Sequence, residues 1–454
     1  MIHRLSRLLL ALVGICAAGS TVGAAEWKVG LAQVKITPEQ PLFMEGYASR
    51  DRPYEKIESD LFVKALVLED REGHRAVLVT SDLIGLTAAV AEPICDRLRT
   101  KLGLQREQVL LNSSHIHTGP MLSLQPQPLR TGMSAADMER TIAYTRWLQD
   151  RIVEVVEKAS AKLEPADLRW GHGVAHFVMN RREWTPTGVK LGANPRGLAD
   201  RTVPVLRVDD AAGRMRAVLF GAAVHNTTLR PQHNRICGDY AGYAQAHVEQ
   251  EHKGVQAMFM IGCAGDADPY PHGSYDLARE HGTALGKEVD RVVETKLQPV
   301  RGSLKVALAQ VDLPLQEWPS REELQKRAAT KRGLEALNAQ RMLDLLDRGE
   351  KPPRTYRCPQ AVWQLGDLTL VALSGEVVVD FVPLLENALG PNRLWIAAYS
   401  NDVYGYLPSA RVLREGGYET RGIYAGSVGT FDPKAQDVLI ETIRKLARDV
   451  GRQN

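Results

Sequence analysis

Two histidines separated by one residue, His115 and His117, lie at the centre of residues 111–120. This stretch follows the apolar run 109–111 and ends in Gly119-Pro120, a strong break in regular structure. The two imidazoles are therefore expected just beyond the end of a strand, where open α/β folds commonly place their chemistry. If strand geometry continues through them, both side chains point to the same face and could hold a metal ion.

Four further apolar runs along the chain also end in polar residues. Strand ends at one edge of a sheet meet in space, so these groups are expected to lie close together. A catalytic zinc site takes a few neutral imidazoles and a carboxylate and leaves one position open for water. His115, His225 and Glu376 supply that set, and Tyr406 is a candidate fourth ligand or hydrogen-bond donor. The polar groups in question are His225 and Asn226, Asp266 and Asp268, Glu376, and Asn401, Asp402, Tyr404 and Tyr406.

Each of these residues also has a structural interpretation. A single His-x-His pair is more often two satisfied loop histidines than a metal site. Asp266 could be a turn or cap residue, and Glu376 could be a helix-start carboxylate stabilised by the helix dipole. Spacing alone also leaves other histidines as competitors for the ligand positions, namely His172, His176, His233 and His247.

The order of apolar runs and helical segments indicates the fold class. Strand-like runs alternate with helices, and Ser134 with Asp137 fits a capping box at the start of one of them. We therefore predict an α/β (mixed α+β) fold, with a large mixed β-sheet core flanked by helices and the active site at the carboxyl ends of strands. Residues 319–351 are rich in Arg, Lys and Glu with a thin apolar stripe, which predicts a charged helical insertion on the outside. A coiled-coil partner site is the alternative for that insertion. The other expected helices cover residues 91–102, 240–251, 274–297 and 433–450.

The amino-terminal residues are typical of a secretory signal peptide. Arg4 and Arg7 precede a short apolar core at residues 8–18, and small residues at 22–24 offer a cleavage point. We therefore expect residues 1–24 to be a signal peptide and the protein to be exported, either to a periplasm or out of the cell. A lipid-modified Cys16 is the second interpretation. Residues 25–454 are expected to form one domain.

Charge and cysteine content exclude some functions. The formal charge is +3, from 57 basic and 54 acidic residues, so no basic field indicates a nucleic-acid partner. The cysteines after the signal show no CxxC or metal-type spacing. One disulfide could form between them in an oxidising compartment. They are Cys95, Cys237, Cys263 and Cys358.

A series of short motifs runs in order through nearly the whole chain after the signal peptide. They are Met44-Glu45-Gly46-Tyr47-Ala48, Ser114-His115-Ile116-His117-Thr118-Gly119-Pro120, Asn180-Arg181, Ala223-Val224-His225, Gly238-Asp239, Gly375-Glu376, Gly405-Tyr406 and Tyr418-Glu419. Together they resemble the N-terminal catalytic domain of the neutral (non-lysosomal) ceramidases, which are secreted or membrane-facing zinc amidases.

The resemblance implies a role for each residue. It implies one Zn²⁺ per chain, bound by His115, His225, Glu376 and Tyr406. It also implies that His117, Arg181 and Tyr418 contact the scissile amide and the head group, a role that suits a cation and two donors facing a developing oxyanion. A lipid amide substrate and peripheral contact with a membrane follow from the same resemblance.

Two departures from the family pattern change what is expected. The family has Gly-Asp-x-Ser-Pro where this chain has Gly265-Asp266-Ala267-Asp268-Pro269, so a serine nucleophile is excluded there. Asp268 could instead orient a water molecule, act as a base, or bind a cationic or polyhydroxyl substrate group. The family usually continues into an immunoglobulin-like domain, whereas this chain stops after its last expected helix, so we expect no such domain.

The resulting hypothesis is an exported zinc-dependent amidohydrolase. It would cleave the N-acyl amide of ceramide or a related N-acyl lipid by attack of zinc-bound water. His115 is then the metal ligand and His117 the substrate contact, with Asp268, Arg181 and Tyr418 as further catalytic residues. The alternatives are a divergent zinc hydrolase of another amide or ester, and a non-catalytic ligand-binding protein on the same scaffold.

Overall fold

The computed structural model describes residues 26–126, 132–330, 334–423 and 429–452. The expected signal peptide, residues 1–24, lies outside these ranges. None of the helices within them combines the length and the apolar character that crossing a bilayer requires.

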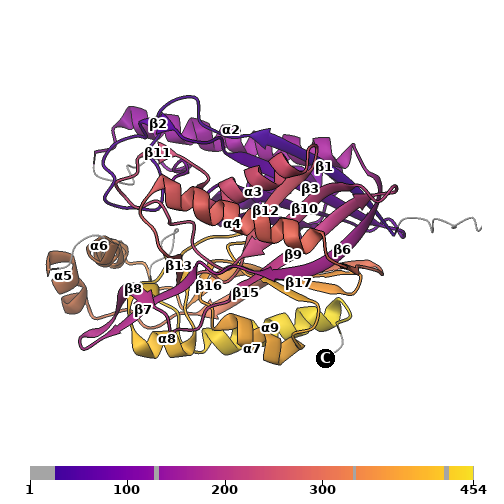
Figure 1. Ribbon diagram of the computed structural model, residues 1–454. Helices are drawn as coiled ribbons and strands as arrows, with labels where there is room; N and C mark the ends of the chain where they lie inside the picture. The colour runs from indigo at the N-terminus through magenta and orange to yellow at the C-terminus, as the bar shows by residue number, and fades with distance from the viewer. Residues whose placement is uncertain (1–25, 127–131, 331–333, 424–428, 453–454) are drawn as a thin grey trace, which may run out of the picture.

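A nine-stranded mixed sheet forms the centre of the protein (Figure 1). Its strand order is β12-β10-β9-β6-β1-β3-β4-β5, and β14 pairs with β6 off this path. Neighbours β4–β5 and β10–β12 are parallel and the other pairs are antiparallel. The strands are β1 (Trp27–Lys35), β3 (Phe62–Asp70), β4 (Arg75–Ser81), β5 (Val109–Ser113), β6 (Glu164–Val174), β9 (Thr202–Asp210), β10 (Met215–Ala222), β12 (Gln256–Ile261) and β14 (Gln298–Pro299).

A second, four-stranded sheet packs against one face of the first, and helices cover the outer faces of both (Figure 1). The second sheet has the order β15 (Leu304–Pro314), β16 (Thr355–Leu365), β17 (Leu368–Ala372), β19 (Leu394–Ala397). The larger sheet is covered by α1 (Ala88–Leu102), α2 (Ala135–Ser160), α3 (Asp239–Glu251) and α4 (Tyr275–Val293), and the smaller by α7 (Phe381–Leu389) and α9 (Ala435–Asp449). The predicted fold class, a large mixed sheet flanked by helices, is confirmed.

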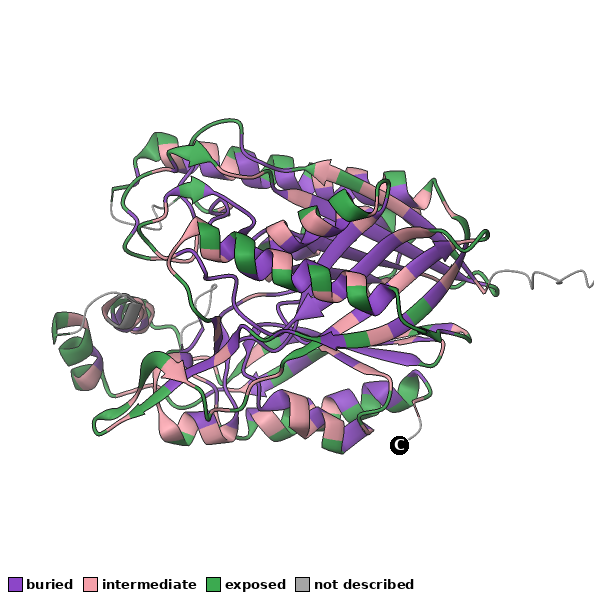
Figure 2. Ribbon diagram, in the orientation of Figure 1, coloured by how far each residue is buried: buried purple, intermediate pink, exposed green. Residues whose placement is uncertain are grey.

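The side chains of the central strands are buried on both faces (Figure 2). In β3, Val63 and Val67 pack among the residues under α1 and α2, whereas Leu66 and Leu68 pack between the two sheets. Successive strand side chains point to opposite faces, so a strand covered on both sides needs a nearly continuous apolar sequence. This explains why these strands read as unbroken apolar runs.

Local sequence signals set the helix ends. Ser134 and Asp137 form the expected capping box, in which the Asp137 backbone N donates to Ser134 Oγ at 3.2 Å and the Ser134 backbone N donates to Asp137 Oδ2 at 2.8 Å. Helix α1 ends at Gly103, whose φ of 70° is left-handed. The charged segment forms two helices, α5 (Arg321–Thr330) and α6 (Leu334–Asp347), which pack on each other at the outside of the protein (Figure 1).

The strand ends meet for a reason that differs from the expected one. β5 and β12 are the opposite edges of the nine-stranded sheet, yet Asn112 joins them, because the Ile261 backbone N donates to its Oδ1 at 3.2 Å. Asn112 Nδ2 also donates to the Ala398 carbonyl at 2.7 Å, just after β19 of the second sheet. The polar strand ends therefore come from both outermost strands of the large sheet and from a second sheet, rather than from neighbouring strands of one sheet.

Shorter elements complete the surroundings of these strand ends. A three-stranded sheet has the order β13-β7-β8, β18 pairs with β20, and β2 pairs with β11. The elements are β2 (Lys56–Ile57), β7 (Val178–Thr185), β8 (Gly188–Asn194), β11 (Arg235–Ile236), β13 (Ala267–Pro269), β18 (Glu376–Val377), β20 (Tyr406–Leu407), α8 (Ala410–Glu415) and the 3₁₀ turns Arg106–Gln108 and Tyr418–Thr420.

The four cysteines within the described ranges are buried free thiols. The disulfide that the sequence left open is therefore not formed among them. They are Cys95, Cys237, Cys263 and Cys358.

Candidate functional site

The backbone after β5 brings the first histidine pair against the second histidine segment. Ile116 forms a parallel bridge with Asn226, so the two segments run side by side. His115 has a φ of 62°, in the left-handed region. Strand geometry therefore does not continue through His115 and His117, contrary to the assumption made from the sequence. The two rings still meet, with 3.2 Å between their Nε2 atoms.

A short parallel ladder delivers the carboxylate and the phenol. Glu376 in β18 and Tyr406 in β20 are direct partners in this ladder, so residues thirty positions apart project side by side. Gly265 lies against this ladder, and a Cβ at that position would come within 2.7 Å of the Glu376 carbonyl oxygen. The close approach of these segments therefore depends on glycine.

The side chains of these segments converge on one point. Glu376 Oε2 lies 3.2 Å from the Nε2 atoms of both His115 and His225. The Tyr406 hydroxyl lies 3.5 Å from His225 Nε2. His115, His225, Glu376 and Tyr406 are all buried. We call these four residues the acceptor cluster.

The hydrogen bonds of the two rings fix their tautomers. His115 Nδ1 lies 2.6 Å from the Ile84 carbonyl oxygen, and His225 Nδ1 lies 2.7 Å from the Ala264 carbonyl oxygen. A carbonyl can only accept, so each Nδ1 carries a proton and the Nε2 atom of each ring faces the Glu376 carboxylate. Two imidazole nitrogens and a carboxylate oxygen thus face one another. The nearest possible donors are the Tyr406 hydroxyl, 3.5 Å from His225 Nε2, and the His117 ring, whose Nε2 lies 3.2 Å from that of His115. Such a set fits a divalent metal ion, and the carbonyl partners are typical of metal-binding histidines.

The protonation states agree with this interpretation. Burial, followed by the nearby Arg181 guanidinium, lowers the pKa of His225 to about 4. Burial acts to raise the pKa of Glu376, but His115 and His225 outweigh it and hold that pKa well below its usual range. At neutral pH the imidazole of His225 is therefore neutral and the carboxylate is ionised, which are the forms that bind a metal.

His117 lies beside the cluster but differs from its members. Its ring offers a ligand atom within 4.8 Å of those of His115 and His225, so the geometry includes it among the candidate metal-binding residues. Its Nδ1, however, is buried without a hydrogen-bond partner among the described residues, so no carbonyl fixes its tautomer. Its ring packs against Gly46, where an added Cβ would come within 2.5 Å of it. The assignment of His117 to the substrate stays a prediction.

Arg181 is placed by an irregularity in β7. The pairing of β7 with β8 shifts register between Asn180 and Arg182, so Arg181 lies in a bulge. Successive residues of a regular strand point to opposite faces, but a bulge re-aims a side chain. Both arginines consequently reach the same buried carboxylate: Arg181 Nε donates to Glu419 Oε1 at 3.0 Å and Arg182 Nη1 donates to Glu419 Oε2 at 2.6 Å.

Arg181 joins this carboxylate to the acceptor cluster. Its Nη2 donates to the Tyr406 hydroxyl at 2.8 Å and to the Gly265 carbonyl at 2.8 Å. The ring of Tyr418 lies beside both groups, with its centroid 5.6 Å from the Tyr406 centroid and 5.6 Å from the Arg181 guanidinium carbon. The structure therefore brings Arg181 and Tyr418 beside the cluster, and their contact with the substrate stays a prediction.

Asp268 has both carboxylate oxygens engaged. Oδ1 accepts from Arg181 Nη1 at 3.1 Å and from Thr227 Oγ1 at 3.2 Å, and Oδ2 accepts from Arg230 Nη2 at 3.1 Å. Burial acts to raise the pKa of Asp268, but Arg181, His225 and Arg230 hold it well below its usual range. An ionised carboxylate of this kind is a weak base, so the geometry favours an orienting role over proton transfer.

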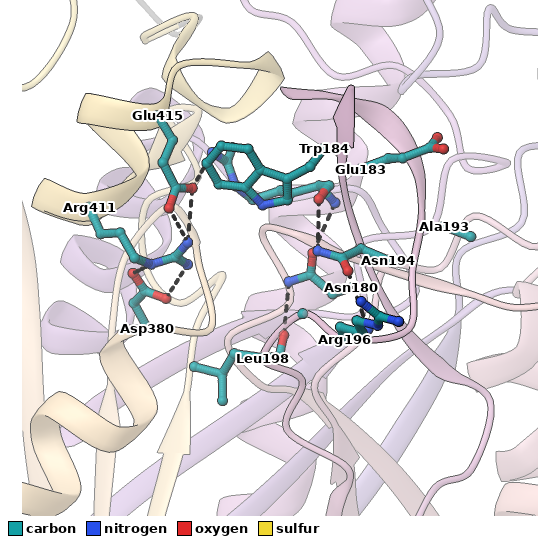
Figure 3. Close-up of a pocket in the computed structure, with 12 residues that line it drawn as sticks. Asn180, Glu183, Trp184, Ala193, Asn194, Arg196, Leu198, Asp380, Arg411 and Glu415 are labelled. Carbon is teal, nitrogen blue, oxygen red and sulfur yellow. Dashed lines mark hydrogen bonds and ion pairs between the residues drawn. The ribbon is translucent and has the colours of Figure 1, made fainter. Parts of the chain in front are cut away.

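The ion pairs continue away from the cluster as an alternating chain. Glu415 contacts both Arg182 and Arg411, and Arg411 also contacts Asp380. This far end lines a cavity of about 580 Å³ beside Trp184 (Figure 3). We call the whole series the ion-pair chain: Arg230, Asp268, Arg181, Glu419, Arg182, Glu415, Arg411 and Asp380.

Sequence reasoning missed several members of this chain and one of its hydrogen-bond partners. Arg182, Arg230 and the partner Thr227 were not among the candidates, and Glu419 appeared only as part of a motif. One signal was available: two consecutive arginines, Arg181 and Arg182, stand in a segment that otherwise reads as a strand. Charged side chains inside a fold require partners, so this pair indicated buried carboxylates.

The sequence matches one protein family over most of its length. Residues 27–325 match the family described as neutral/alkaline non-lysosomal ceramidase, N-terminal. The match includes His115, Arg181 and His225, whereas Glu376 and Tyr406 lie beyond it.

Individual relatives agree with the family match. The neutral ceramidase of Pseudomonas aeruginosa is 27% identical over 257 residues, covering 54% of this chain and 37% of that protein. Neutral ceramidase A of Dictyostelium discoideum is 26% identical over 243 residues, covering 52% of this chain and 33% of that protein. The match therefore spans about a third of the length of these relatives.

Solved structures share the fold. The crystal structure of neutral ceramidase from Pseudomonas aeruginosa has a TM-score of 0.71 at 22% identity, covering 93% of this chain and 74% of that chain. A structure described as ceramidase complexed with C2 has a TM-score of 0.72 at 20% identity, covering 95% of this chain and 76% of that chain. At these identities the likeness concerns the fold alone. The family match over residues 27–325 shows that this chain belongs to the neutral/alkaline non-lysosomal ceramidase family.

Proposed function

We propose that the protein is a zinc-dependent hydrolase that cleaves the N-acyl amide of ceramide or a related N-acyl lipid. The observation that carries this proposal is the acceptor cluster, in which the Nε2 atoms of His115 and His225 both lie 3.2 Å from the Glu376 carboxylate while their Nδ1 atoms are bonded to backbone carbonyls. His115, His225, Glu376 and Tyr406 are the residues that would hold the metal. Membership of the ceramidase family supports amide hydrolysis as the reaction class.

Residues around the metal site would stabilise charge on the substrate and position the groups that do so. Bound zinc supplies a lowered pKa for a coordinated water molecule and polarises a carbonyl oxygen. Arg181 and Tyr418 lie at the edge of the cluster, where a cation and a phenol can stabilise negative charge on the amide oxygen. Asp268 and Glu419 hold the Arg181 guanidinium from two directions.

His117 is suited to proton transfer to the leaving amine. Burial, followed by its neighbours His115 and His225, lowers the pKa of His117 well below the usual histidine value. Its ring is therefore neutral at rest, and its unpartnered Nδ1 leaves either nitrogen able to hold the proton. A lowered pKa makes the neutral ring a weak base, but it also means that the protonated ring readily gives its proton to the departing nitrogen.

We also propose export and contact with a membrane surface. The signal-like residues 1–24 support export to a periplasm or out of the cell. A lipid substrate must be drawn from a bilayer, and the hairpin of β7 and β8 exposes Trp184 and Leu191 at 62% and 50% of their surfaces. Cell fractionation and co-sedimentation with lipid vesicles test these two points.

The function is tested by metal content and turnover of the purified protein. We expect stoichiometric zinc, release of fatty acid from an N-acyl substrate, and loss of both in His115→Ala and His225→Ala. His247→Ala is the matched control, because His247 pairs with Asp290 away from the cluster. Absence of zinc, with the two cluster variants unchanged, would contradict the proposal. Retained zinc without turnover of any N-acyl amide or ester would identify a binding protein instead.

A further inference from the structure

Arg230 is the end of the ion-pair chain that lies at the candidate site. Each interior member of the chain contacts two opposite charges, whereas Arg230 contacts the single carboxylate of Asp268. Asp268 in turn shares its charge with Arg181. The charge of Arg230 is therefore only partly compensated.

The remaining contacts of Arg230 add no negative charge. Its Nε donates to His272 Nδ1 at 3.1 Å, which is a contact to a neutral ring nitrogen. Its Nη1 has no hydrogen-bond partner within the described part of the chain, and 24% of its side chain is exposed. A partly exposed guanidinium with free donors is a binding group for a carboxylate or a phosphate.

The pKa values of two neighbouring side chains, Tyr47 and His272, depend on the charges of both Arg230 and Asp268. Burial raises the pKa of Tyr47, and Arg230 opposes this more strongly than Asp268 reinforces it. Burial lowers the pKa of His272, and Arg230 adds to this more strongly than Asp268 opposes it. At both positions the effect of Arg230 is larger than that of Asp268, which places the guanidinium near both rings.

Arg230 also lies next to the place where the amide must bind. The ring of Tyr47, which senses the charge of Arg230, lies with its centroid 4.8 Å from that of His117. On the other side, Asp268 joins Arg230 to Arg181, whose Nη2 reaches the Tyr406 hydroxyl. A group bound by Arg230 would therefore lie a short distance from the acceptor cluster.

We propose that Arg230 binds an anionic group, a carboxylate or a phosphate, on the amine portion of the N-acyl substrate. The amine portion is chosen because a fatty acyl chain carries no charge. A cationic substrate group at Asp268 is disfavoured, since both oxygens of this carboxylate already accept hydrogen bonds from the protein. The inference rests on the proposed N-acyl amide hydrolysis and names its substrate class.

The experiment compares substrates that differ only in the amine portion. The zinc-loaded protein is assayed with N-dodecanoylglycine, N-dodecanoyl-O-phosphoethanolamine and the neutral N-dodecanoylethanolamine. We expect kcat/KM for at least one anionic substrate to exceed that for the neutral one by about tenfold or more, because a charge-assisted hydrogen bond to a partly buried guanidinium is worth that factor. The better anionic substrate then distinguishes a carboxylate from a phosphate.

Arg230→Gln tests the residue itself. We expect it to lower kcat/KM for the preferred anionic substrate by roughly tenfold to a hundredfold, while the neutral substrate changes by less than about threefold. Arg411→Gln is the matched control, because Arg411 belongs to the opposite end of the same chain, and it is expected to leave the substrate ratio unchanged. Should Arg230→Gln fail to fold, Arg230→Lys keeps the charge and is expected to keep the preference for the anion.

Binding without turnover removes any contribution of the metal. N-dodecanoylglycine is titrated into the metal-free protein, and its affinity is expected to exceed that of N-dodecanoylethanolamine and to fall as salt is added. Equal or better turnover of the neutral substrate, with Arg230→Gln unchanged, would overturn the inference while leaving amide hydrolysis intact. No turnover of any of the three substrates by zinc-loaded protein would overturn the proposed function and the inference with it.

Discussion

Two adjoining polar groups in this protein handle buried charge in opposite ways. In the ion-pair chain, each interior carboxylate lies between two arginines, as Glu419 does between Arg181 and Arg182 at 3.0 and 2.6 Å. In the acceptor cluster, His115 and His225 direct bare nitrogens at a carboxylate, and both of their protons are bonded elsewhere. The two groups touch where Arg181 donates to the Tyr406 hydroxyl.

The difference separates structural polar groups from those that need a ligand. Interior charges that supply one another's partners can persist in a buried place without any added group. Acceptor atoms that face one another this closely are unfavourable unless a cation enters, and in a folded protein that cation is a proton or a metal. The ion-pair chain is therefore expected to stabilise the fold and to position Arg181, whereas the acceptor cluster is expected to bind a metal.

His225→Ala is expected to show the largest effect on the cluster. Removal of one of the lone pairs should lower zinc affinity by more than about a hundredfold and abolish turnover, because loss of even an outer-shell partner costs about 10- to 100-fold. Zinc content after dialysis against a metal buffer is the measurement. A variant with full zinc content and activity would remove the basis of the comparison.

His117→Ala should separate the neighbouring histidine from the cluster. We expect turnover to fall by roughly a hundredfold or more, the usual contribution of a proton-transferring side chain, while zinc content stays near that of the wild type. Parallel measurement of kcat and bound zinc decides between the two roles. Loss of zinc in proportion to activity would make His117 a ligand, as its position within 4.8 Å of the other two rings permits.

Glu419→Gln tests the self-compensation of the chain. The substitution leaves Arg181 and Arg182 buried together without their shared counter-charge. We expect the free energy of unfolding to fall by about 3 kcal/mol, the lower end of the cost of breaking a buried pair. Urea denaturation of the zinc-loaded protein measures this change. Zinc loss with unchanged stability would mean that the chain serves the cluster rather than the fold.

The double variant Arg182→Met with Glu419→Gln sharpens this test. It removes one charge of each sign, so the protein should recover part of the stability lost in the single variant. Turnover should stay below that of the wild type, because Arg181 has lost one of the two carboxylates that orient it. Full recovery of turnover would show that Glu419 has no positioning role.

The pH dependence of the metal-free protein tests the protonation state of His225 in the cluster. His225 has a pKa of about 4 when folded, against an ordinary value of 6.5, so between these pH values the unfolded chain binds a proton that the folded chain does not. Stability therefore falls as pH drops through this window, by about 3 kcal/mol in total. Burial raises the pKa of Asp266 to about 6, which acts in the opposite direction. The measurement is accordingly the difference between wild type and His225→Gln in denaturation at pH 7 and pH 5, and an identical pH dependence of the two would contradict it.

Local sequence pattern predicted the elements and the candidates with useful accuracy. The runs that became β3, β4, β10 and β12, and the capping box at Ser134, depend on side chains close together in the chain. The same holds for the position of His115 just after β5. Residue type then restricted the ligands, because histidine, cysteine and the carboxylates are the side chains that usually bind zinc.

The arrangement that unites these candidates could not be read from the same patterns. Helices and strands are recognised from sequence periods of a few residues. The contacts of Asn112 with Ile261 and Ala398 instead join three segments that are far apart in the chain. The bulge that turns Arg181 and Arg182 to one carboxylate depends on how β7 pairs with β8, and pairing register has no strong local signal here. Arg230 was missed because no local sequence pattern marks it as a neighbour of Asp268.

The sequence by itself thus determined which chemistry is available: imidazoles and a carboxylate at strand ends, a family resemblance, and Asp268 in place of a serine. Only the tertiary structure decided how those groups are used. It bonds the Nδ1 atoms of His115 and His225 to backbone carbonyls, which leaves their Nε2 atoms to face a cation. It also placed Asp268 between two arginines, which keeps that carboxylate ionised and fully bonded. The physical reason is that protonation state and charge compensation depend on distances of a few ångströms between segments far apart in the chain.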